Sequence, residues 1–421
     1  MSQLKKSSSS DDLTVALGYA EPERYEALQF PHRESGKSAT PLATLDNLRS
    51  LLNFYKIVVR YNVISKRISF MIPGEEFSSE NYEEAAFACI YSMMKENRLP
   101  THNYQPYLMR IADENQYNPV MDFIRSRPWD GISRLQNLYD TIESPEVEAK
   151  ELLIRRWLIT AVCMAKGEGV DSAGCLVLQG PQDLGKTWWA RKLFPESVRR
   201  DFIRTDAMVD PKDKDSVSQC ISYWIVELGE IGATFRKSDI DALKAFITRD
   251  HDTMRRPYGI GDKRYPRRTA FVASVDQTIY LHDTAGNRRF WTIPCVSINS
   301  YHTIDMQQVW AEVLAIVDAG EDWRMRPDEK EHVRRINSQH MQIEPIMDMI
   351  RERYDLESLT IGEWKSATQI ADSIGLKNIT QRETRIIASF LQHIGVENRT
   401  SKGYRQYKVT TRHHLNTTLD Y

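Results

Sequence analysis

One segment of the sequence has residue types and spacing suited to binding a polyphosphate, because it matches the pattern GxxxxGK(S/T). The apolar run before it predicts a buried strand over residues 175–179, and residues 187–193 read as the helix that follows. Glycines at both ends let backbone N–H groups face phosphates, and the helix N-terminus adds a favourable dipole. We predict ATP binding, with Lys186 on the β and γ phosphates and the Thr187 hydroxyl on Mg²⁺. The predicted loop residues are Gly180, Pro181, Gln182, Asp183, Leu184, Gly185, Lys186 and Thr187.

A second predicted strand, over residues 221–227, ends in an acid beside this loop. A carboxylate at the end of a neighbouring strand can hold the shell of a magnesium ion and orient water. We therefore predict that Glu227 lies on the metal side and that Glu230 polarises the attacking water. The alternative is that both acids belong to an exposed turn.

Two further groups complete the predicted catalytic set. The apolar run 269–276 predicts a third buried strand, and either Ser274 or Asp276 at its end is placed to sense the γ phosphate. Arg288 and Arg289 follow, beside aromatic residues. A guanidinium there could reach a γ phosphate in its own subunit or, as an arginine finger, across a subunit interface. The alternative is an ordinary pair of surface arginines.

A basic stretch between the second and third strands predicts contact with DNA. Residues 255–268 hold six basic side chains against one acid, with tyrosines among them and glycines at a turn. This pattern is typical of a hairpin that carries phosphate-binding groups. The alternatives are ion pairs with neighbouring subunits or a solvated edge. The predicted contacts are Lys263 and Arg264 at the turn, followed by Arg267 and Arg268.

The C-terminal region has a second basic surface. Helical patterns over residues 367–373 and 381–393 precede a hairpin around residues 396–409, which is a winged-helix order. Residues 377–412 contain eight Lys and Arg against two Glu. We predict DNA contacts by Arg385, Lys402 and Arg405, and the alternative is a protein-docking module.

In their order along the chain, these motifs resemble the virulence-associated protein E family of phage and genomic-island ATPases, related to superfamily 3 replicative helicases. The resemblance covers roughly residues 100–320 and implies an AAA+ core in a ring, commonly a hexamer, with ATP at subunit interfaces and DNA in the central channel. It adds weight to Arg288 or Arg289 as a finger acting in trans. The family has glycine at the position of Asp183 and Thr-Asn at Val275-Asp276. The segments that carry it are 180–187, 226–231, 244–247, 256–259, 271–272 and 286–291, with 117–120, 129–131 and Arg134 upstream.

The elements that must position these residues predict an α/β fold with a largely parallel sheet, an AAA+ P-loop ATPase core between a small α+β domain and a winged-helix domain. The expected boundaries are a flexible leader over 1–40, the α+β domain over 41–135, the ATPase domain over 136–320, a linker over 321–344 and the winged-helix-like domain over 345–421.

Composition limits the classes of protein that fit. The chain has 421 residues and a net charge of −2, which excludes a globally basic nucleic-acid coat but not a local basic surface. The five cysteines are scattered, so neither a disulfide framework nor a structural zinc site is expected. There is no apolar run of membrane-spanning length, and the start is polar. We expect a cytoplasmic protein of a bacterial host cell with no membrane partner.

These observations favour an ATP-dependent DNA helicase or translocase that replicates a phage or mobile genetic element. The alternative is an ATP-switched origin-binding or helicase-loading protein that does not unwind DNA, and a signalling ATPase is more remote. No metal-ligand cluster of a zinc-binding primase is present in the sequence, so priming would come from a separate partner.

Overall fold

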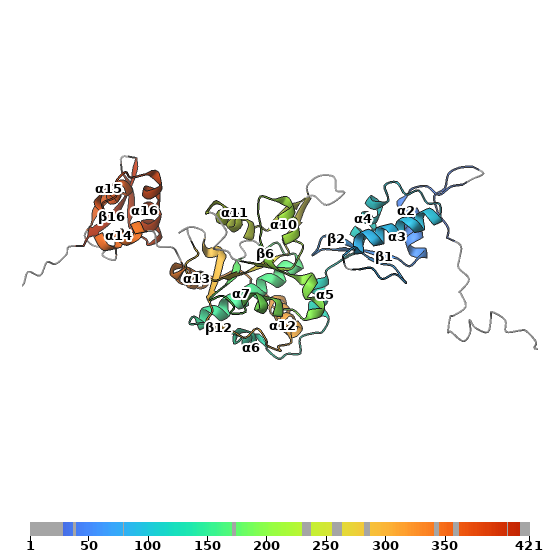
Figure 1. The fold of residues 1–421 in the computed structure, drawn as a ribbon, viewed down its shortest axis with the longest axis horizontal. Helices are drawn as coiled ribbons and strands as arrows, with labels where there is room; N and C mark the ends of the chain where they lie inside the picture. Colours follow the sequence, from blue (N-terminus) through green and yellow to red (C-terminus); the bar gives the residue numbers. More distant parts are fainter. Residues whose placement is uncertain are drawn as a thin grey trace, which may run out of the picture. The chain divides into compact units, whose positions relative to one another are not determined.

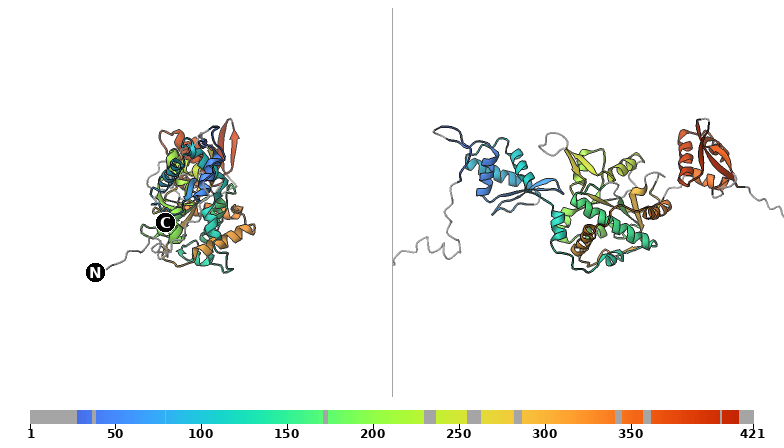
Figure 2. Two further views of the ribbon diagram at one scale, coloured as in Figure 1. Left: turned by 90° about the vertical axis from the view of Figure 1, so that its right-hand side faces the viewer. Right: turned by 180° about the vertical axis from the view of Figure 1, so that it is seen from behind.

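The computed structural model divides the chain into two compact units, Met1–Tyr117 and Asn118–Tyr421 (Figure 1, Figure 2). Of the predicted site residues, Glu230 and Lys402 lie outside the described part of the chain. The described residues are 28–36, 39–78, 80–170, 174–229, 237–254, 263–281, 287–340, 345–356, 362–401 and 403–412.

The first unit packs helices against a small sheet. Its first described helix begins after Thr44, whose hydroxyl accepts the Asn47 N–H, and it buries three leucines at helical spacing. The alternating apolar residues 57–63 contain a strand that pairs with the next strand in a hairpin. The first strand ends at Asn62 because that side chain accepts the N–H groups of Ile64 and Ser65 and turns the chain back. The elements are α2 (Leu45–Phe54), β1 (Val58–Asn62), β2 (Arg67–Met71), α3 (Tyr82–Glu96), α4 (Tyr104–Glu114) and β3 (Gln116–Tyr117).

Part of the expected flexible leader is held in place. Phe30 is buried, and the side-chain amide of Asn47 bonds both the N–H and the carbonyl of His32. The described residues of the leader therefore dock against α2, which sequence composition alone does not indicate.

The second unit is built around a parallel sheet, which confirms the predicted mixed α/β architecture. In the described part of the chain, five strands pair with all neighbours parallel. The strand expected over residues 221–227 begins only at Ile225, because α10 (Lys214–Cys220) and a turn occupy the residues before it. In order across the sheet, the strands are β11 (Phe290–Pro294), β5 (Cys175–Gln179), β10 (Ala270–Val275), β7 (Ile225–Leu228) and β6 (Ile203–Ala207).

Both faces of this sheet are covered. Successive residues of β5 point to opposite faces, yet every residue from Cys175 to Leu178 is fully buried. Helix α7 (Val147–Lys166), labelled in Figure 1, packs against β5, β10 and β11. The Trp157 indole N–H donates to the Phe271 carbonyl at 2.7 Å, and the Trp224 indole donates to a carbonyl of α7 at 2.9 Å. Helix and sheet are thus joined by large apolar groups whose polar atoms are satisfied.

Residues 118–135, expected in the first domain, belong to the second unit. The Asn118 side chain donates to the Ala165 carbonyl at 2.8 Å, and Gln307 donates to the Ile124 carbonyl at 2.8 Å. These bonds attach α5 (Pro119–Arg125) to α7 and α12 (Met306–Asp318). The remaining elements around the sheet are α6 (Leu135–Tyr139), β4 (Ile142–Glu143), α8 (Lys186–Lys192), α9 (Glu196–Phe202), α11 (Lys237–Ile247), β8 (His251–Met254), β9 (Lys263–Pro266), η1 (Asn287–Arg289) and β12 (Ser297–Ile298).

The range 321–344, expected to be a linker, contains the packed helix α13 (Pro327–Gln339). Val333 and Ile336 are buried, and the Asn337 side chain donates to the Phe290 carbonyl at 2.9 Å. Arg156 of α7 holds Glu329 through two hydrogen bonds, at 2.7 and 3.0 Å. The high charge of this range therefore belongs partly to buried ion pairs and not to a solvated connection.

The C-terminal segment has its own core, which contains Ile370, Ile387, Leu391 and Tyr407. Its two predicted helices have the expected bounds, because capping boxes at Ser366 and Thr380 fix where they begin. The elements are α14 (Pro345–Arg353), β13 (Tyr354–Asp355), β14 (Glu363–Ser366), α15 (Ala367–Ser373), α16 (Gln381–His393), β15 (Asn398–Ser401) and β16 (Tyr404–Thr411). Within the described ranges, no helix combines the length and apolar character needed to cross a membrane.

The buried pair of Arg156 and Glu329 predicts a measurable loss of stability. Glu329→Ala leaves a buried guanidinium without its main partner, so the free energy of unfolding should fall by about 3 kcal/mol. Glu331→Ala on the exposed face of the same helix is the control and should change it by about 0.5 kcal/mol or less. Both values come from urea titration, and equal losses in the two variants would contradict the prediction.

The same difference should depend on pH. Burial raises the pKa of Glu329, but hydrogen bonds to Arg156 and the Arg326 backbone outweigh it, so the net pKa is lowered. A lowered folded-state pKa stabilises the fold above the ordinary pKa of the group, and this contribution is lost as pH falls through the folded value. The gap between wild type and Glu329→Ala should therefore be constant near neutral pH and shrink below roughly pH 4.

Candidate functional site

Lys186 lies where the β5 strand, the glycine-rich loop and α8 meet. Its side chain is 6% exposed. The ammonium group donates to the carbonyls of Gly180 at 2.8 Å and Pro181 at 2.6 Å. It also lies 2.8 Å from an Asp276 carboxylate oxygen. The predicted phosphate-binding lysine is thus held inside the loop by three oxygen atoms.

The backbone of the loop explains its glycines. At Gly180 a Cβ atom would lie 2.7 Å from the Cys295 carbonyl oxygen, closer than real contacts allow. Gly185 has φ +87° and Asp183 has φ +62°, both in the left-handed region. Asp183 adopts this conformation without being glycine, at a strain of about 1 kcal/mol.

The side-chain oxygens of Thr187 and Glu227 lie next to each other beside the loop, and both are of the kind that binds a metal ion. The Thr187 hydroxyl donates to a Glu227 carboxylate oxygen at 3.1 Å, and the Ser274 hydroxyl lies 3.4 Å from Thr187. Glu227 is fully buried, and its second oxygen accepts the Asp206 N–H at 2.8 Å. This backbone donor was not predicted, because no sequence pattern identifies it. It compensates part of the cost of burying the carboxylate.

These donors suit a magnesium ion that arrives with a polyphosphate. Mg²⁺ prefers oxygen ligands and is usually held by one or two protein groups together with phosphates and waters. Thr187 and Glu227 provide such oxygens side by side. In the described ranges, no group of three or more His, Cys, Asp or Glu is arranged to hold a metal without a ligand. The residues therefore fit a metal bound jointly with a nucleotide.

Both predicted sensor residues lie at this edge. Ser274 contacts Thr187, and Asp276, one residue beyond β10, contacts Lys186. The edge forms because β5, β7 and β10 are parallel, so their carboxyl ends lie together. The sequence did not decide which of Ser274 and Asp276 is the sensor. In the structure they contact different residues, Ser274 next to Thr187 and Asp276 next to Lys186.

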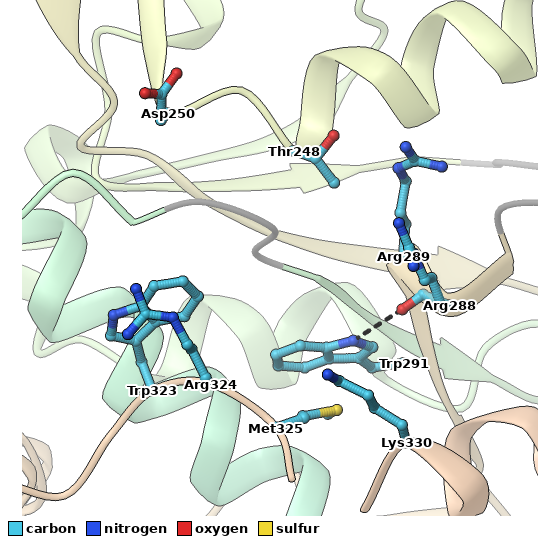
Figure 3. A pocket seen from close by; sticks show the side chains of 9 residues that line it. All are labelled: Thr248, Asp250, Arg288, Arg289, Trp291, Trp323, Arg324, Met325 and Lys330. Carbon is cyan, nitrogen blue, oxygen red and sulfur yellow. Dashed lines mark hydrogen bonds between the residues drawn. The ribbon is translucent and has the colours of Figure 1, made fainter. Parts of the chain in front are cut away.

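The predicted arginines lie at the opposite end of the parallel strands, where the amino ends of the strands meet. Arg288 and Arg289 precede β11, whose first residue, Phe290, pairs with Cys175 at the start of β5. The phosphate loop follows the other end of β5, about 13 Å further along the strand. Arg288 and Arg289 therefore do not join Lys186. They line a cavity of about 380 Å³, with the Trp291 indole N–H donating to the Arg288 carbonyl at 3.2 Å (Figure 3).

Two of the predicted DNA contacts remain accessible. Lys263 and Arg264 are exposed on β9, which pairs with β8 in a hairpin. An Arg264 nitrogen lies 3.6 Å from Asp250 and 3.1 Å from His251 Nδ1. The turn between the two strands lies outside the described residues.

Arg267 requires a correction. It was predicted to contact DNA, but it is fully buried and forms a two-pronged ion pair with Asp252, stacked near the ring of Phe246. It fixes the hairpin to the core instead. Arg268 is also directed inward, because its guanidinium donates to the Ala165 carbonyl in the last turn of α7. A cation there stabilises the negative end of the helix.

The C-terminal candidates are surface residues. Arg385 on α16 and Arg405 on β16 are exposed, and Tyr404 beside Arg405 is 72% exposed. Sequence reasoning missed Arg399 on β15, which is exposed with its guanidinium 4.3 Å from the Trp364 ring centroid. Its place in the basic range 377–412 was the available signal.

Comparison with known proteins identifies one family. The family model described as the virulence-associated protein E-like domain matches residues 124–342, which is more than half of the chain. No curated protein matches the sequence. Solved structures with some likeness include the apo NrS-1 C-terminal region, at 14% identity over 87% of this chain and 98% of that one, with a TM-score of 0.44. Another is the JCV helicase, at 12% identity over 65% and 83%, with a TM-score of 0.24. TM-scores this low do not establish a shared fold.

The contact between Lys186 and Asp276 predicts a gain in polyphosphate affinity on removing the acid. A polyphosphate must displace the carboxylate from Lys186 and is repelled by its charge. Asp276→Asn should therefore bind inorganic triphosphate and ATP about fivefold more tightly, the carboxylate being half exposed and partly screened. Calorimetric titration measures both. Asp318→Asn, at a distant exposed acid paired with Lys166, is the control, and unchanged affinity in Asp276→Asn would contradict the prediction.

Proposed function

Because the chain belongs to the virulence-associated protein E-like domain family, we propose that it is an ATP-dependent DNA helicase or translocase for replication of a phage or mobile genetic element. Its catalytic core is proposed to be an AAA+ P-loop ATPase. The observation that carries the proposal is the meeting of Lys186, Thr187 and Glu227 at one sheet edge.

Each residue of this edge has a proposed task. Lys186 leaves the loop carbonyls and Asp276 to contact the β and γ phosphates, so the bonds that hold it in the free protein are exchanged for bonds to the nucleotide. Thr187 and Glu227 would hold Mg²⁺, which when bound offsets phosphate charge. Ser274 and Asp276 follow the state of the γ phosphate, and Glu230 polarises the attacking water.

The separation of the phosphate loop from the arginines within one chain is an argument for assembly into a ring. Arg288 and Arg289 lie at the edge away from the phosphate loop of their own chain, so they suit a γ phosphate bound by a neighbouring copy. A closed ring in which every loop faces the next copy's arginines, with six copies as the expected number, satisfies this arrangement. ATP at such interfaces would be completed by two chains, and hydrolysis would change the contact between them.

DNA is proposed to pass through the centre of the ring. Lys263 and Arg264 are the exposed cations of the β8–β9 hairpin, and Arg267 anchors the base of that hairpin in the core. Movement between copies during hydrolysis would carry the hairpin and the bound strand. The exposed cations Arg385 and Arg405 are proposed to contact duplex DNA at an origin.

A loader without unwinding activity is the alternative, and the exposed C-terminal cations are the observation in its favour. It shares the phosphate loop and the DNA contacts, so binding data alone do not separate the two functions. A strand-displacement assay on a forked duplex does, because a loader alone separates no strands.

The proposal predicts the behaviour of Lys186→Ala. Removing the ammonium that contacts the transferred phosphate should lower the rate of ATP hydrolysis by about a thousandfold or more and abolish strand displacement together. Phosphate release with and without single-stranded DNA, and unwinding of a forked duplex, are the measurements. DNA-stimulated hydrolysis at the wild-type rate in this variant would overturn the assignment. Hydrolysis without unwinding in the wild type would favour the loader.

A further inference from the structure

The cavity beside Arg288 and Arg289 holds more positive charge than an arginine finger requires. Among the described residues, four cationic side chains and one acid, Asp250, line it, and two indole rings form part of its wall (Figure 3). Like charges gathered beside apolar walls focus an electric field and favour an anion with several charges. The four cations are those of Arg288, Arg289, Arg324 and Lys330.

Asp250, the acid that lines the cavity, contacts residues of the β8–β9 hairpin. An Asp250 oxygen lies 2.7 Å from His251 Nδ1 and 3.6 Å from Arg264, both on the β8–β9 hairpin. Among the ion pairs of the described residues, none involves Arg288 or Lys330, and both side chains are exposed. These two charges are therefore available to a ligand.

The second half of the cavity is held on a fixed frame. Arg155 of α7 forms two hydrogen bonds to Glu321, at 2.5 and 3.0 Å, and Arg156 holds Glu329 and the Asp322 carbonyl. The segment that carries Arg324 and Lys330 is thus tied to α7 at both ends, before Arg324 and again in the first turn of α13. The Arg324 guanidinium lies 4.4 Å from the Trp323 ring centroid. The backbone that carries Arg324 and Lys330 is fixed in this way, whereas both side chains are exposed and Arg324 lies 3.5 Å from an Asp322 oxygen, so a ligand orders the side chains but not the segment.

We infer that this cavity binds the terminal phosphates of a nucleotide held by a second copy of the chain, and that Arg324 and Lys330 act on them together with Arg288 and Arg289. The inference rests on the proposed function and adds two residues from a segment outside the predicted site. The chain's own nucleotide does not fit the role, because the phosphate loop lies at the other edge of the sheet.

A nucleic-acid strand fits the cavity less well than a polyphosphate. A strand carries one charge per nucleotide and is bound by grooves that follow its backbone. Here four cations converge on one space of about 380 Å³. A triphosphate carries its charges on adjacent phosphate groups, so one cavity of this size can hold them.

The test measures ATP hydrolysis by mixtures of two variants. Arg324→Ala/Lys330→Ala should lower the rate roughly tenfold to a hundredfold, because two charge-assisted contacts to the reacting phosphate are lost. Lys186→Ala lacks the loop but keeps the cavity. Equal amounts of the two variants, reassembled at random, should recover activity, because about a quarter of the interfaces then join an intact loop to an intact cavity.

Arg334→Ala is the matched control, since this α13 residue is 62% exposed and pairs only with Glu331 in the described part of the chain. It should keep the wild-type rate, and the variants at the exposed residues Arg324, Lys330 and Arg334 should share the wild-type unfolding midpoint. Lys330→Arg, which keeps the charge, should retain most of the activity. A wild-type rate in Arg324→Ala/Lys330→Ala would overturn the inference while leaving the proposed function intact. A loss that the mixture does not restore would show that the cavity serves its own chain, and would also overturn it. An inactive wild-type protein would instead overturn the proposed function, and the inference with it.

Discussion

The parallel direction of the central strands is the constraint on which the rest of the structure depends. In a parallel sheet every strand delivers its carboxyl end to the same edge. Lys186 and Thr187 after β5, Glu227 on β7 and Ser274 on β10 are therefore neighbours, although Thr187 and Ser274 are 87 positions apart along the chain. The same direction places Arg288, which precedes its strand, at the other edge. One geometric rule thus both assembles the proposed phosphate site and keeps the arginines away from it.

Packing converts this rule into fixed positions. The tryptophans of α7 and of the segment before β7 bury their rings while their N–H groups bond backbone carbonyls across the helix–sheet contact. The two arginines in the middle of α7 bind acids near α13, so one helix fixes both the sheet and the segment beside the cavity. Buried charges in this unit are either paired, as in Arg156 with Glu329, or hydrogen-bonded to backbone and hydroxyl groups, as in Glu227, which offsets the cost of desolvation. Arg267 pairs with Asp252 inside the hairpin proposed to contact DNA, and its guanidinium lies 4.4 Å from the Phe246 ring centroid, which holds the hairpin against the core.

Local sequence signals predicted the local parts of this structure. The phosphate loop was predictable because its spacing and its flanking strand and helix are one continuous segment, and α15 and α16 were predictable because caps and apolar periodicity agree. Long-range partners were not. Nothing near Arg267 indicates that Asp252 neutralises it, and nothing in the charged range 321–340 indicates that Arg156 pairs with Glu329. A count of charges measures what a segment carries, and only the fold decides which charges reach the surface. For the same reason the sequence did not indicate that Arg324 and Lys330 line the same cavity as Arg288.

The central claim is that the nucleotide lies between two copies of the chain, because the phosphate loop and the arginine-lined cavity are on opposite edges of one sheet. The most direct test is the mass of the wild-type assembly in solution with and without ATP and single-stranded DNA. The account predicts a closed ring that forms or tightens when nucleotide is added, with a mass near that of six chains. A protein that hydrolyses ATP at full rate while its mass stays that of one chain would contradict it.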